Sequence, residues 1–359
     1  MSPNTPLIIH DLCQIKGGGE RLVYTLCQGL AADLVTGHIG QNTFDFSQLA
    51  GQVIDLQALS RIHGIKTWAL ARAFKQLTPP KPNSNPVIYS GVASPLAVQH
   101  YPQARNVFYC HTPPRFVYDK RAHYASELGP IKRLAFRALI NWFKPQYEAA
   151  VEHMDAVLTN SEFVRKRIQK HLGLDAEVIY PPCDTSHFRW QEAGDYYLSL
   201  ARHDELKRID QIIEAFKRMP DKKLVVASGG EQTTQLQKAA AGYDNIQFTG
   251  WLSEAEYLSL LGGCLATIYI PVDEDFGMTP VESMSAGKPV ICSDHGGMLE
   301  SVLDQETGLY VGSNNLAQNL INQVTKLTKQ RALTMRQACE HRAQDFDTAL
   351  FMQKIKEFL

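Results

Sequence analysis

Several features common in other protein classes are missing from this sequence. Its 36 basic and 37 acidic side chains leave a formal net charge of -1, so it lacks the basic excess of nucleic-acid-binding proteins. No apolar run approaches the ~20 residues that a membrane-spanning helix needs. Segment 1–12 has neither the basic region nor the apolar core of a signal peptide. We therefore expect a soluble, cytoplasmic protein that binds no nucleic acid.

Paired cysteines and metal-binding spacings are also missing. The seven cysteines are dispersed along the chain without a CxxC pair, at Cys13, Cys27, Cys110, Cys183, Cys264, Cys292 and Cys339. An odd, scattered set is typical of reduced, buried thiols rather than of a disulfide framework or a zinc site. The sequence thus predicts neither disulfides nor a metal held by cysteine.

The chain is long enough for two domains. A single hydrophobic core rarely grows beyond about 250–300 residues, and this chain has 359. Short apolar segments alternate with helical segments in both halves, which predicts two parallel sheets with helices on both faces. Pro181-Pro182 interrupts regular structure, which indicates a boundary between about 184 and 195. We expect domains at 1–185 and 190–344.

Three further expectations concern how these domains are built. The last helix, about 345–359, should pack back on the first domain. The helical segment 131–153 should be kinked or broken near Pro145, because proline lacks the N–H that an α-helix uses. Two α/β halves of similar size predict a ligand-binding cleft between them, at the carboxyl ends of the strands.

Segment 270–282 carries the strongest chemical pattern in the sequence. A buried strand leads into an acidic loop with a glycine and then into a helix, for which Thr279 suits the N-cap, Pro280 position N1 and Glu282 position N3. The amides that would face outward at this positive helix end belong to Gly277, Met278 and Thr279. Such an end can bind a diphosphate. From spacing alone, a capping box beside a solvated loop fits equally well.

The carboxylates of this segment suggest a sugar-binding role. Glu274 could accept hydrogen bonds from sugar hydroxyls, and Glu282 could accept them from a ribose. The run Asp273-Glu274-Asp275 could instead hold a divalent cation as a D-x-D motif. We expect no metal, because the two α/β halves and nearby cationic side chains favour charge neutralisation by the protein itself.

The spacing of the two glutamates carries a resemblance to a known family. Glu274 and Glu282 enclose seven residues, which resembles the E-x7-E motif of retaining glycosyltransferases of family 4, in the glycogen-synthase-like superfamily with the GT-B fold. Segments 284–290 and 307–309, with Gly296-Gly297, continue the resemblance, which covers nearly the whole chain. It implies two Rossmann-like domains facing each other across a cleft. It also implies that Glu274 contacts the donor sugar and Glu282 the donor ribose.

Two cations leave the first strand of the second half. A pyrophosphate leaving group gains negative charge as the glycosidic bond breaks, and fixed cations stabilise that charge without a metal. The family carries an arginine here and a lysine five residues later, which Arg202 and Lys207 match. Arg208 stays open as an alternative for either role, although adjacent basic residues on a loop are often only solvated.

Two sites in the first half complete the resemblance. Gly17, Gly18 and Gly19 follow a strand and allow a ligand to approach the backbone closely. By the resemblance, this loop faces the reacting sugar and the acceptor. His111 also follows a strand, where a lone histidine is often structural, and in the family a histidine here contacts the donor sugar. The His-Thr-Pro-x-Arg form around Arg115 resembles bacterial mannosyltransferases of lipopolysaccharide O-chain assembly.

The resemblance implies a reaction and its substrates. A hexose moves with retention from a nucleotide diphosphate donor, with GDP-mannose favoured over UDP-glucose or UDP-N-acetylglucosamine, to a lipid-linked or growing saccharide of envelope polysaccharide synthesis. No cofactor is expected beyond the donor, and no side chain stands out as a nucleophile. A nicotinamide-dependent oxidoreductase is disfavoured because G-x-G-x-x-G is absent. A non-catalytic scaffold of the same fold is disfavoured by the retained motif residues.

Segment 131–144 suggests contact with a membrane surface. Its basic residues are Lys132, Arg133, Arg137 and Lys144, and its apolar residues include Leu134, Phe136, Leu139, Trp142 and Phe143. A basic amphipathic helix can lie on anionic lipid, here the inner face of the plasma membrane. The same pattern fits a helix that packs on the sheet and leaves its basic residues in solvent. Both interpretations remain open at this point.

Overall fold

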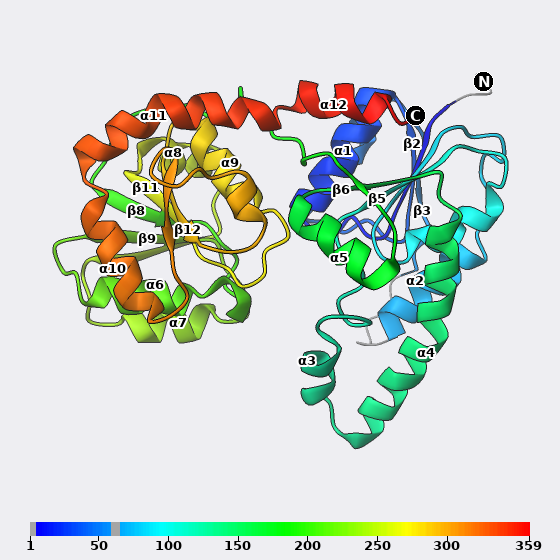
Figure 1. Ribbon diagram of the computed structural model, residues 1–359, viewed down its shortest axis with the longest axis horizontal. Helices are drawn as coiled ribbons and strands as arrows, with labels where there is room; N and C mark the ends of the chain where they lie inside the picture. The colour runs from blue at the N-terminus through cyan, green and yellow to red at the C-terminus, as the bar shows by residue number, and fades with distance from the viewer. Residues whose placement is uncertain (1–4, 59–64) are drawn as a thin grey trace. The chain divides into compact units, whose positions relative to one another are not determined.

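The computed structural model describes residues 5–58 and 65–359, and the chain packs as two compact α/β units (Figure 1). The first unit comprises Met1–Pro182 and Phe351–Leu359, and the second comprises Cys183–Leu350. The division falls directly after Pro181-Pro182, slightly before the expected range of 184–195. Two consecutive prolines lack the N–H groups that a helix or a sheet would require.

The first unit is built on a seven-stranded sheet in the order β3-β2-β1-β4-β5-β6-β7, in which every pair is parallel. The strands are β1 (Leu7–His10), β2 (Asp33–Thr36), β3 (Val53–Asp55), β4 (Val87–Ser90), β5 (Asn106–Cys110), β6 (Ala156–Thr159) and β7 (Glu177–Val178). The central strands are apolar and buried, as a parallel sheet covered on both faces requires.

Helices cover both faces of this sheet. The helices of this unit are α1 (Gly18–Leu30), α2 (Ile65–Lys75), α3 (Arg121–Ser126), α4 (Pro130–Glu152) and α5 (Glu162–Leu172), with short 3-10 helices η1 (Phe46–Gln48) and η2 (Ser94–His100). Successive side chains of a strand point to opposite faces, so Ile8 of β1 joins one core and Ile9 the other. The first core includes Leu22 and Leu26 of α1, and the second includes Phe143 of α4.

The C-terminal helix α12 (Thr348–Lys356) completes the first unit. Phe351 and Ile355 are both almost fully buried and lie in the same core as α1. The Phe351 ring also contacts the Tyr109 ring of β5, with 6.3 Å between centroids. The end of the chain therefore packs on a domain that is otherwise built from residues before position 183.

The second unit has a six-stranded parallel sheet in the order β10-β9-β8-β11-β12-β13. Its strands are β8 (Tyr196–Ser199), β9 (Lys223–Ala227), β10 (Ile246–Gly250), β11 (Ala266–Tyr269), β12 (Val290–Ser293) and β13 (Gly308–Val311). Its helices are α6 (Ile209–Lys217), α7 (Thr233–Ala240), α8 (Glu254–Gly263), α9 (Met278–Ser285), α10 (Leu316–Lys326) and α11 (Lys329–Ala343), with η3 (Glu205–Lys207), η4 (Gly297–Glu300) and η5 (Gln344–Phe346).

Helix α4 continues through Pro145, so of the two expected outcomes at this residue, a kink or a break, the break is wrong. Pro145 is itself exposed, whereas Ile140, Phe143 and Tyr147 on either side are buried in one continuous core. Packing of this apolar face outweighs the loss of one backbone hydrogen bond. No helix of residues 5–58 and 65–359 combines the length and the apolar character that crossing a bilayer would need.

Two separate helices, α10 and α11, follow the last strand of the second unit. α10 ends at Lys326, and α11 begins at Lys329 after Thr328, whose side chain accepts a hydrogen bond from the Arg331 N–H. Such an N-cap satisfies one of the amides that a helix start leaves unpaired, which stabilises the new start. All seven cysteines lie in the described part of the chain, where they are buried and form no disulfide bond.

Candidate functional site

Three loops at the carboxyl edge of the second sheet carry several of the predicted residues. The loop after β8 contains Arg202 and Lys207, the loop after β11 contains Glu274, and the loop after β12 contains Gly296-Gly297. Backbone hydrogen bonds join them. Val272 N–H donates to the Leu206 carbonyl at 2.8 Å, and Gly297 N–H donates to the Glu274 carbonyl at 2.9 Å. Residues far apart in sequence are therefore held next to one another.

Lys207 and Glu274 form an ion pair at this edge. Lys207 Nζ lies 2.6 Å from Glu274 Oε2 and 3.1 Å from the Tyr269 hydroxyl oxygen. The two charged side chains are 20% and 22% exposed, so the pair can meet a ligand from solvent. Burial, together with the Glu274 carboxylate, raises the pKa of Tyr269 well above its usual value, so this phenol stays protonated. The structure thus unites a cation and a carboxylate that the sequence identified separately.

The other basic residues of the β8 loop lie elsewhere. Arg202 pairs with Asp204, with Nη2 2.9 Å from Oδ2, and its side chain remains 62% exposed. Arg208 adopts a left-handed φ of 53° at the start of α6, and its side chain lines a pocket described below. Lys207 is therefore the cation that the structure places on Glu274, and Arg202 is an exposed cation on the same loop.

Helix α9 begins two residues earlier than expected, so the predicted capping box at Thr279 is wrong. Gly277 occupies the N-cap position with φ of 86°, and no side chain caps this helix start. Thr279 lies inside the helix, where its carbonyl accepts a hydrogen bond from Ser283 Oγ at 2.7 Å. Pro280 fits the third helical position because amides of the first turn have no intrahelical partner. The positive φ of glycine turns the chain into the helix without a side-chain cap.

Glu282 has a different partner from the one that a capping box would give it. The residue is only 7% exposed, and its carboxylate accepts a hydrogen bond from the Tyr257 hydroxyl of α8 at 2.5 Å. Tyr257 packs edge-on against the Phe188 ring. Glu282 is thus held in place by a neighbouring helix. Sequence reasoning missed Tyr257 and Tyr269, because only tertiary packing brings either phenol to the two glutamates.

Glycines let the acidic loop pack closely. A Cβ on Gly277 would lie 3.1 Å from Tyr269 Cε1 and 3.3 Å from Met298 Cγ. A Cβ on Gly297 would lie 2.1 Å from the Asp275 carbonyl oxygen, which is a forbidden contact. The pairing of these loops therefore depends on glycine at both positions. Within the described part of the chain, no group of three or more His, Cys, Asp or Glu side chains is placed to hold a metal ion.

The predicted residues of the first unit gather at the carboxyl edge of its own sheet. His111 follows β5, and its Nε2 lies 2.9 Å from Ser90 Oγ at the end of β4. His10 ends β1, and its Nδ1 lies 3.0 Å from Ser90 Oγ and 2.9 Å from the Ser90 carbonyl oxygen. A Cβ on Gly19 would lie 3.8 Å from His111 Cε1. The glycine loop and the histidine, separately predicted, are thus neighbours.

The environment of His111 keeps its ring neutral. Burial, assisted by His10, lowers the pKa of His111 to about 3. The Asn160 side chain donates a hydrogen bond to the His111 carbonyl at 3.1 Å, which holds the backbone after β5. Arg115 pairs with Asp119, four residues later, at 2.8 Å. His111 therefore offers a neutral ring, whereas the Arg115 charge is matched by a local carboxylate.

Gly17, Gly18 and Gly19 form the start of α1. Gly17 is the N-cap residue, with extended backbone angles, and the helix begins at Gly18. A Cβ on Gly17 would lie 2.7 Å from Glu20 Oε2, so the first turn is tight. A glycine-rich helix start leaves its amides accessible to a ligand.

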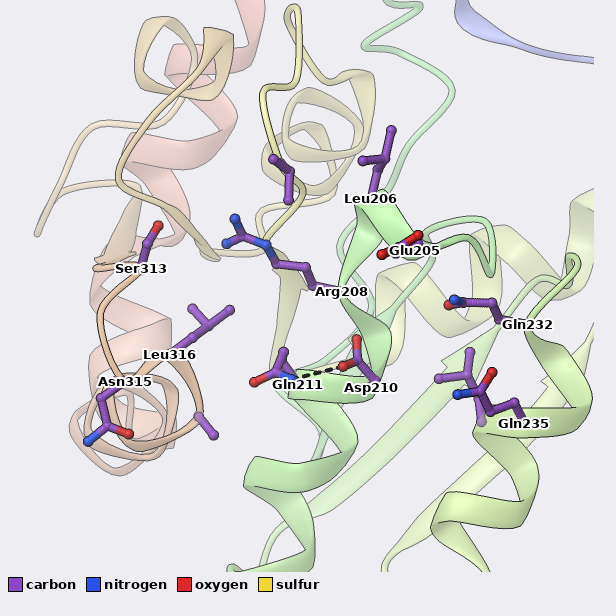
Figure 2. A pocket seen from close by; sticks show the side chains of 13 residues that line it. Glu205, Leu206, Arg208, Asp210, Gln211, Gln232, Gln235, Ser313, Asn315 and Leu316 are labelled. Carbon is purple, nitrogen blue, oxygen red and sulfur yellow. Dashed lines mark hydrogen bonds between the residues drawn. The ribbon is translucent and has the colours of Figure 1, made fainter. Parts of the chain in front are cut away.

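A pocket of about 760 Å³ opens in the second unit where the N-terminal ends of α6, α7 and α10 converge. Figure 2 shows Arg208 extending across it toward Ser313, with Gln232 and Gln235 on the opposite side. Glu205 and Asp210 contribute negative charge to its lining. The residues that line the pocket include neither Lys207 nor Glu274, so it is distinct from the ion pair.

Comparisons with known proteins found relatives of both halves of the chain. The model for Glycosyltransferase Family 4 matches residues 16–187, and the model for Glycosyl transferases group 1 matches residues 185–346. The alpha-1,3/1,6-mannosyltransferase ALG2 of Dictyostelium discoideum is 28% identical over 256 residues, which cover 58% of each protein. Human ALG2 is 29% identical over 237 residues, which cover 56% of this chain and 54% of ALG2. The chain thus spans little more than half the length of these relatives.

Solved structures share the fold over almost the whole chain. Sucrose-phosphate synthase from Thermosynechococcus elongatus aligns with a TM-score of 0.78 at 18% identity, covering 99% of this chain and 98% of that one. Anabaena HepE, in complex with UDP and glucose, aligns with a TM-score of 0.71 at 17% identity, covering 97% and 98%. These likenesses and the two parallel-sheet units show the GT-B fold. With two consecutive family models matching residues 16–346, the chain belongs to the family 4 glycosyltransferases.

Proposed function

We propose that this glycosyltransferase transfers mannose with retention from GDP-mannose to a saccharide or lipid-linked saccharide, without a metal ion. The observation that carries the proposal is the Lys207–Glu274 ion pair beside the start of α9. It joins a cation suited to a phosphate and a carboxylate suited to sugar hydroxyls. A nucleotide diphosphate sugar contains both a phosphate and a sugar, so it fits this combination better than a phosphate or a sugar alone does.

The diphosphate of the donor would bind at the start of α9. The backbone amides of Gly277, Met278 and Thr279 belong to the first turn, where amides have no intrahelical partner and the helix dipole favours an anion. Lys207 supplies a full positive charge next to this turn, and Arg202 supplies a second cation from the same loop. Glu282, oriented by Tyr257, would accept a hydrogen bond from the ribose.

Charge stabilisation by fixed groups would supply much of the catalysis. As the sugar leaves the diphosphate, negative charge grows on the phosphate, and Lys207 is already oriented by Glu274 and Tyr269. The opposite oxygen of Glu274 would contact the sugar. His111, neutral because its pKa is low, would donate a hydrogen bond to the donor sugar. By resemblance to the family, the acceptor hydroxyl attacks the same face and the leaving phosphate takes its proton.

The identity of the sugar rests on two kinds of support. The ALG2 relatives are named mannosyltransferases, and the His-Thr-Pro-x-Arg segment around His111 resembles bacterial mannosyltransferases. HepE, whose structure holds UDP and glucose, supports a UDP-sugar donor as the second candidate. From the same resemblance, we propose that the reaction belongs to cell-envelope polysaccharide synthesis, on the cytoplasmic side of the membrane.

Thermal unfolding against nucleotides tests the donor. A ligand that binds only the folded state raises the melting temperature, so GDP and GDP-mannose should raise it more than UDP, UDP-glucose or NADH do. Turnover of GDP-mannose should continue in EDTA, and NMR of the product should show a retained anomeric configuration. A manganese requirement would favour the D-x-D interpretation of Asp273–Asp275. Stabilisation by UDP alone would assign the second donor, and the absence of any shift and any turnover would favour a non-catalytic protein.

A further inference from the structure

The tip formed by α3 and the first turns of α4 is the most exposed apolar region of the first unit. Ile131 is 86% exposed and Leu134 is 70% exposed, and Tyr124 of α3 is 43% exposed. In Figure 1, α3 and the start of α4 extend beyond the body of the sheet. Arg133 ties the two helices together, since its Nε donates to the Ala125 carbonyl and its Nη2 to the Leu128 carbonyl. We call residues 120–138 the tip.

Helix α4 has two apolar faces, and only one of them is used by the fold. Phe136, Ile140 and Phe143 point toward the first unit, where Ile140 and Phe143 are fully buried. Ile131 and Leu134 are three residues apart and share the opposite face, which the described residues leave uncovered. A helix face with large exposed apolar residues is expected to have a partner.

The charge around this second face identifies the partner's chemistry. The tip contains five basic residues and one acidic residue, Glu127, whereas the whole chain has a net charge of -1. The basic residues are Lys120, Arg121, Lys132, Arg133 and Arg137. All of these except Lys120 are exposed. Apolar side chains bordered by cations fit an anionic, apolar surface.

We propose that the tip inserts Ile131 and Leu134 into the surface of an anionic phospholipid bilayer, with its lysines and arginines bound to the headgroups. The apolar pair lies in the acyl boundary, and the cations remain at headgroup level. This placement goes beyond the transfer reaction proposed above. It would hold the enzyme where a lipid-linked acceptor is found.

Vesicle flotation of the 359-residue chain tests the proposal. The protein should float with phosphatidylcholine vesicles that contain phosphatidylglycerol and stay unbound to phosphatidylcholine alone. The double variant I131S/L134S should bind about 100-fold more weakly, because it removes two insertable side chains of this size. K132Q/R137Q should bind about 25-fold more weakly, since each charge near an anionic surface contributes about fivefold.

Matched variants separate this role from general effects. Leu333 of α11 is 39% exposed, and Lys166 and Lys170 of α5 are exposed, so L333S and K166Q/K170Q make similar changes away from the tip. Both should float like the unchanged protein. Flotation that survives I131S/L134S, or that never occurs on anionic vesicles, overturns the proposal. Dimerisation that I131S/L134S abolishes would assign the face to a second copy instead. GDP-mannose should raise the melting temperature of all these variants. If GDP-mannose stabilises none of the proteins, the proposed function is contradicted, and the membrane proposal is unaffected.

A second inference concerns the hydrogen-bond chain His10–Ser90–His111. A carbonyl oxygen only accepts, so the contact between His10 Nδ1 and the Ser90 carbonyl requires a proton on His10 Nδ1. That proton also faces Ser90 Oγ at 3.0 Å. The Ser90 hydroxyl is left with one acceptor among its described contacts, His111 Nε2 at 2.9 Å. His111 Nε2 is therefore the acceptor, and in a neutral ring the proton lies on Nδ1.

The geometry points to Ser90 and His10 as positioning residues that fix the Nδ1–H tautomer of His111. The three side chains end the adjacent strands β1, β4 and β5, so the sheet itself sets their separation. His111 is half-buried, and its Nδ1 has no hydrogen-bond partner among residues 5–58 and 65–359. Its N–H is thus available to a ligand oxygen. The use of this donor rests on the proposed function, whereas the tautomer itself does not.

Nitrogen-15 NMR of histidine-labelled protein tests the tautomer directly, with the His111 signal identified by its loss in H111Q. The unchanged protein should show Nδ1–H, and S90A should shift His111 toward Nε2–H. S90A should also lower kcat about tenfold or more with little change in KM for the donor. S94A is the matched control, because Ser94 is equally buried and its hydroxyl has no partner in the described chain. An Nε2–H tautomer in the unchanged protein, or no change of tautomer in S90A, overturns this inference.

Discussion

Replacing Lys207 by methionine removes the charge of the ion pair while keeping a side chain of similar length. Two unit charges about 4 Å apart interact by about 4 kcal/mol at the effective dielectric constant of about 20 that suits a protein surface. Only the part of the phosphate charge that develops in the transition state contributes to the rate acceleration. K207M should therefore lose about 2–4 kcal/mol of transition-state stabilisation. This corresponds to a fall in kcat/KM of about 30- to 1,000-fold.

The fold should be almost unaffected by this substitution. Lys207 and Glu274 are both about one-fifth exposed, and ion pairs that solvent can reach contribute at most about 1 kcal/mol to stability. A change of that size shifts Tm by only about 2–4 °C in a unit of this length. Loss of activity without loss of the folded state therefore distinguishes a role in transfer from a structural role.

Steady-state release of the nucleoside diphosphate measures the effect, and Lys217 provides a matched control. Lys217 pairs with Glu214 at 3.2 Å and lies 5.2 Å from the Tyr243 ring centre, whereas Lys207 lies 5.3 Å from that of Tyr269. K217M should therefore show the same small change in Tm and unchanged turnover. Turnover of K207M within about threefold of the unchanged protein, or an equal loss in K217M, would refute the reasoning.

Three further changes test other parts of the site. E274A should lower turnover by at least about 100-fold with the fold retained, measured by activity and circular dichroism; near-normal turnover would exclude Glu274 from the reaction. G277A should destabilise the second unit by about 1–3 kcal/mol in urea unfolding, because alanine at φ of 86° is strained and its Cβ would crowd Tyr269. G242A is the control, since Gly242 is exposed, has φ of 85° and has open space around it; a smaller loss of stability in G277A than in G242A would contradict the close packing. Because the pKa of His111 is about 3, only the unfolded state binds a proton on this ring as the pH falls from about 6.5 toward 3, so the contribution of His111 to stability is complete above pH 6.5 and should decline by at most about 2 kcal/mol by pH 5. Urea unfolding of H111Q at pH 6.5 and pH 5 should lack this decline, and the same pH dependence in H111Q and the unchanged protein would show that His111 titrates normally.

The sequence by itself determined the local architecture. The alternation of short apolar segments with helical segments predicted two parallel sheets, and strands such as Val87–Ser90 and Lys223–Ala227 are short apolar runs of this kind, because a buried parallel strand needs an apolar run between turn residues. The spacing of Glu274 and Glu282 likewise belongs to one continuous segment and can be read directly. Local signals failed where packing outweighed them, as at Pro145, which lies within an unbroken helix.

Only the tertiary structure decided which of these residues meet. Lys207 contacts Glu274 and Tyr269 because three loops leave neighbouring strands at one sheet edge, and His111 meets Ser90 for the same reason in the other unit. The start of α9 at Gly277, rather than a cap at Thr279, depends on a positive φ and close contacts that sequence spacing does not encode. The exposure of Ile131, too, depends on which face of α4 the sheet covers. The spacing of residues along the chain reflects local conformation. Contacts between distant segments arise only when the sheets bring the strand ends together.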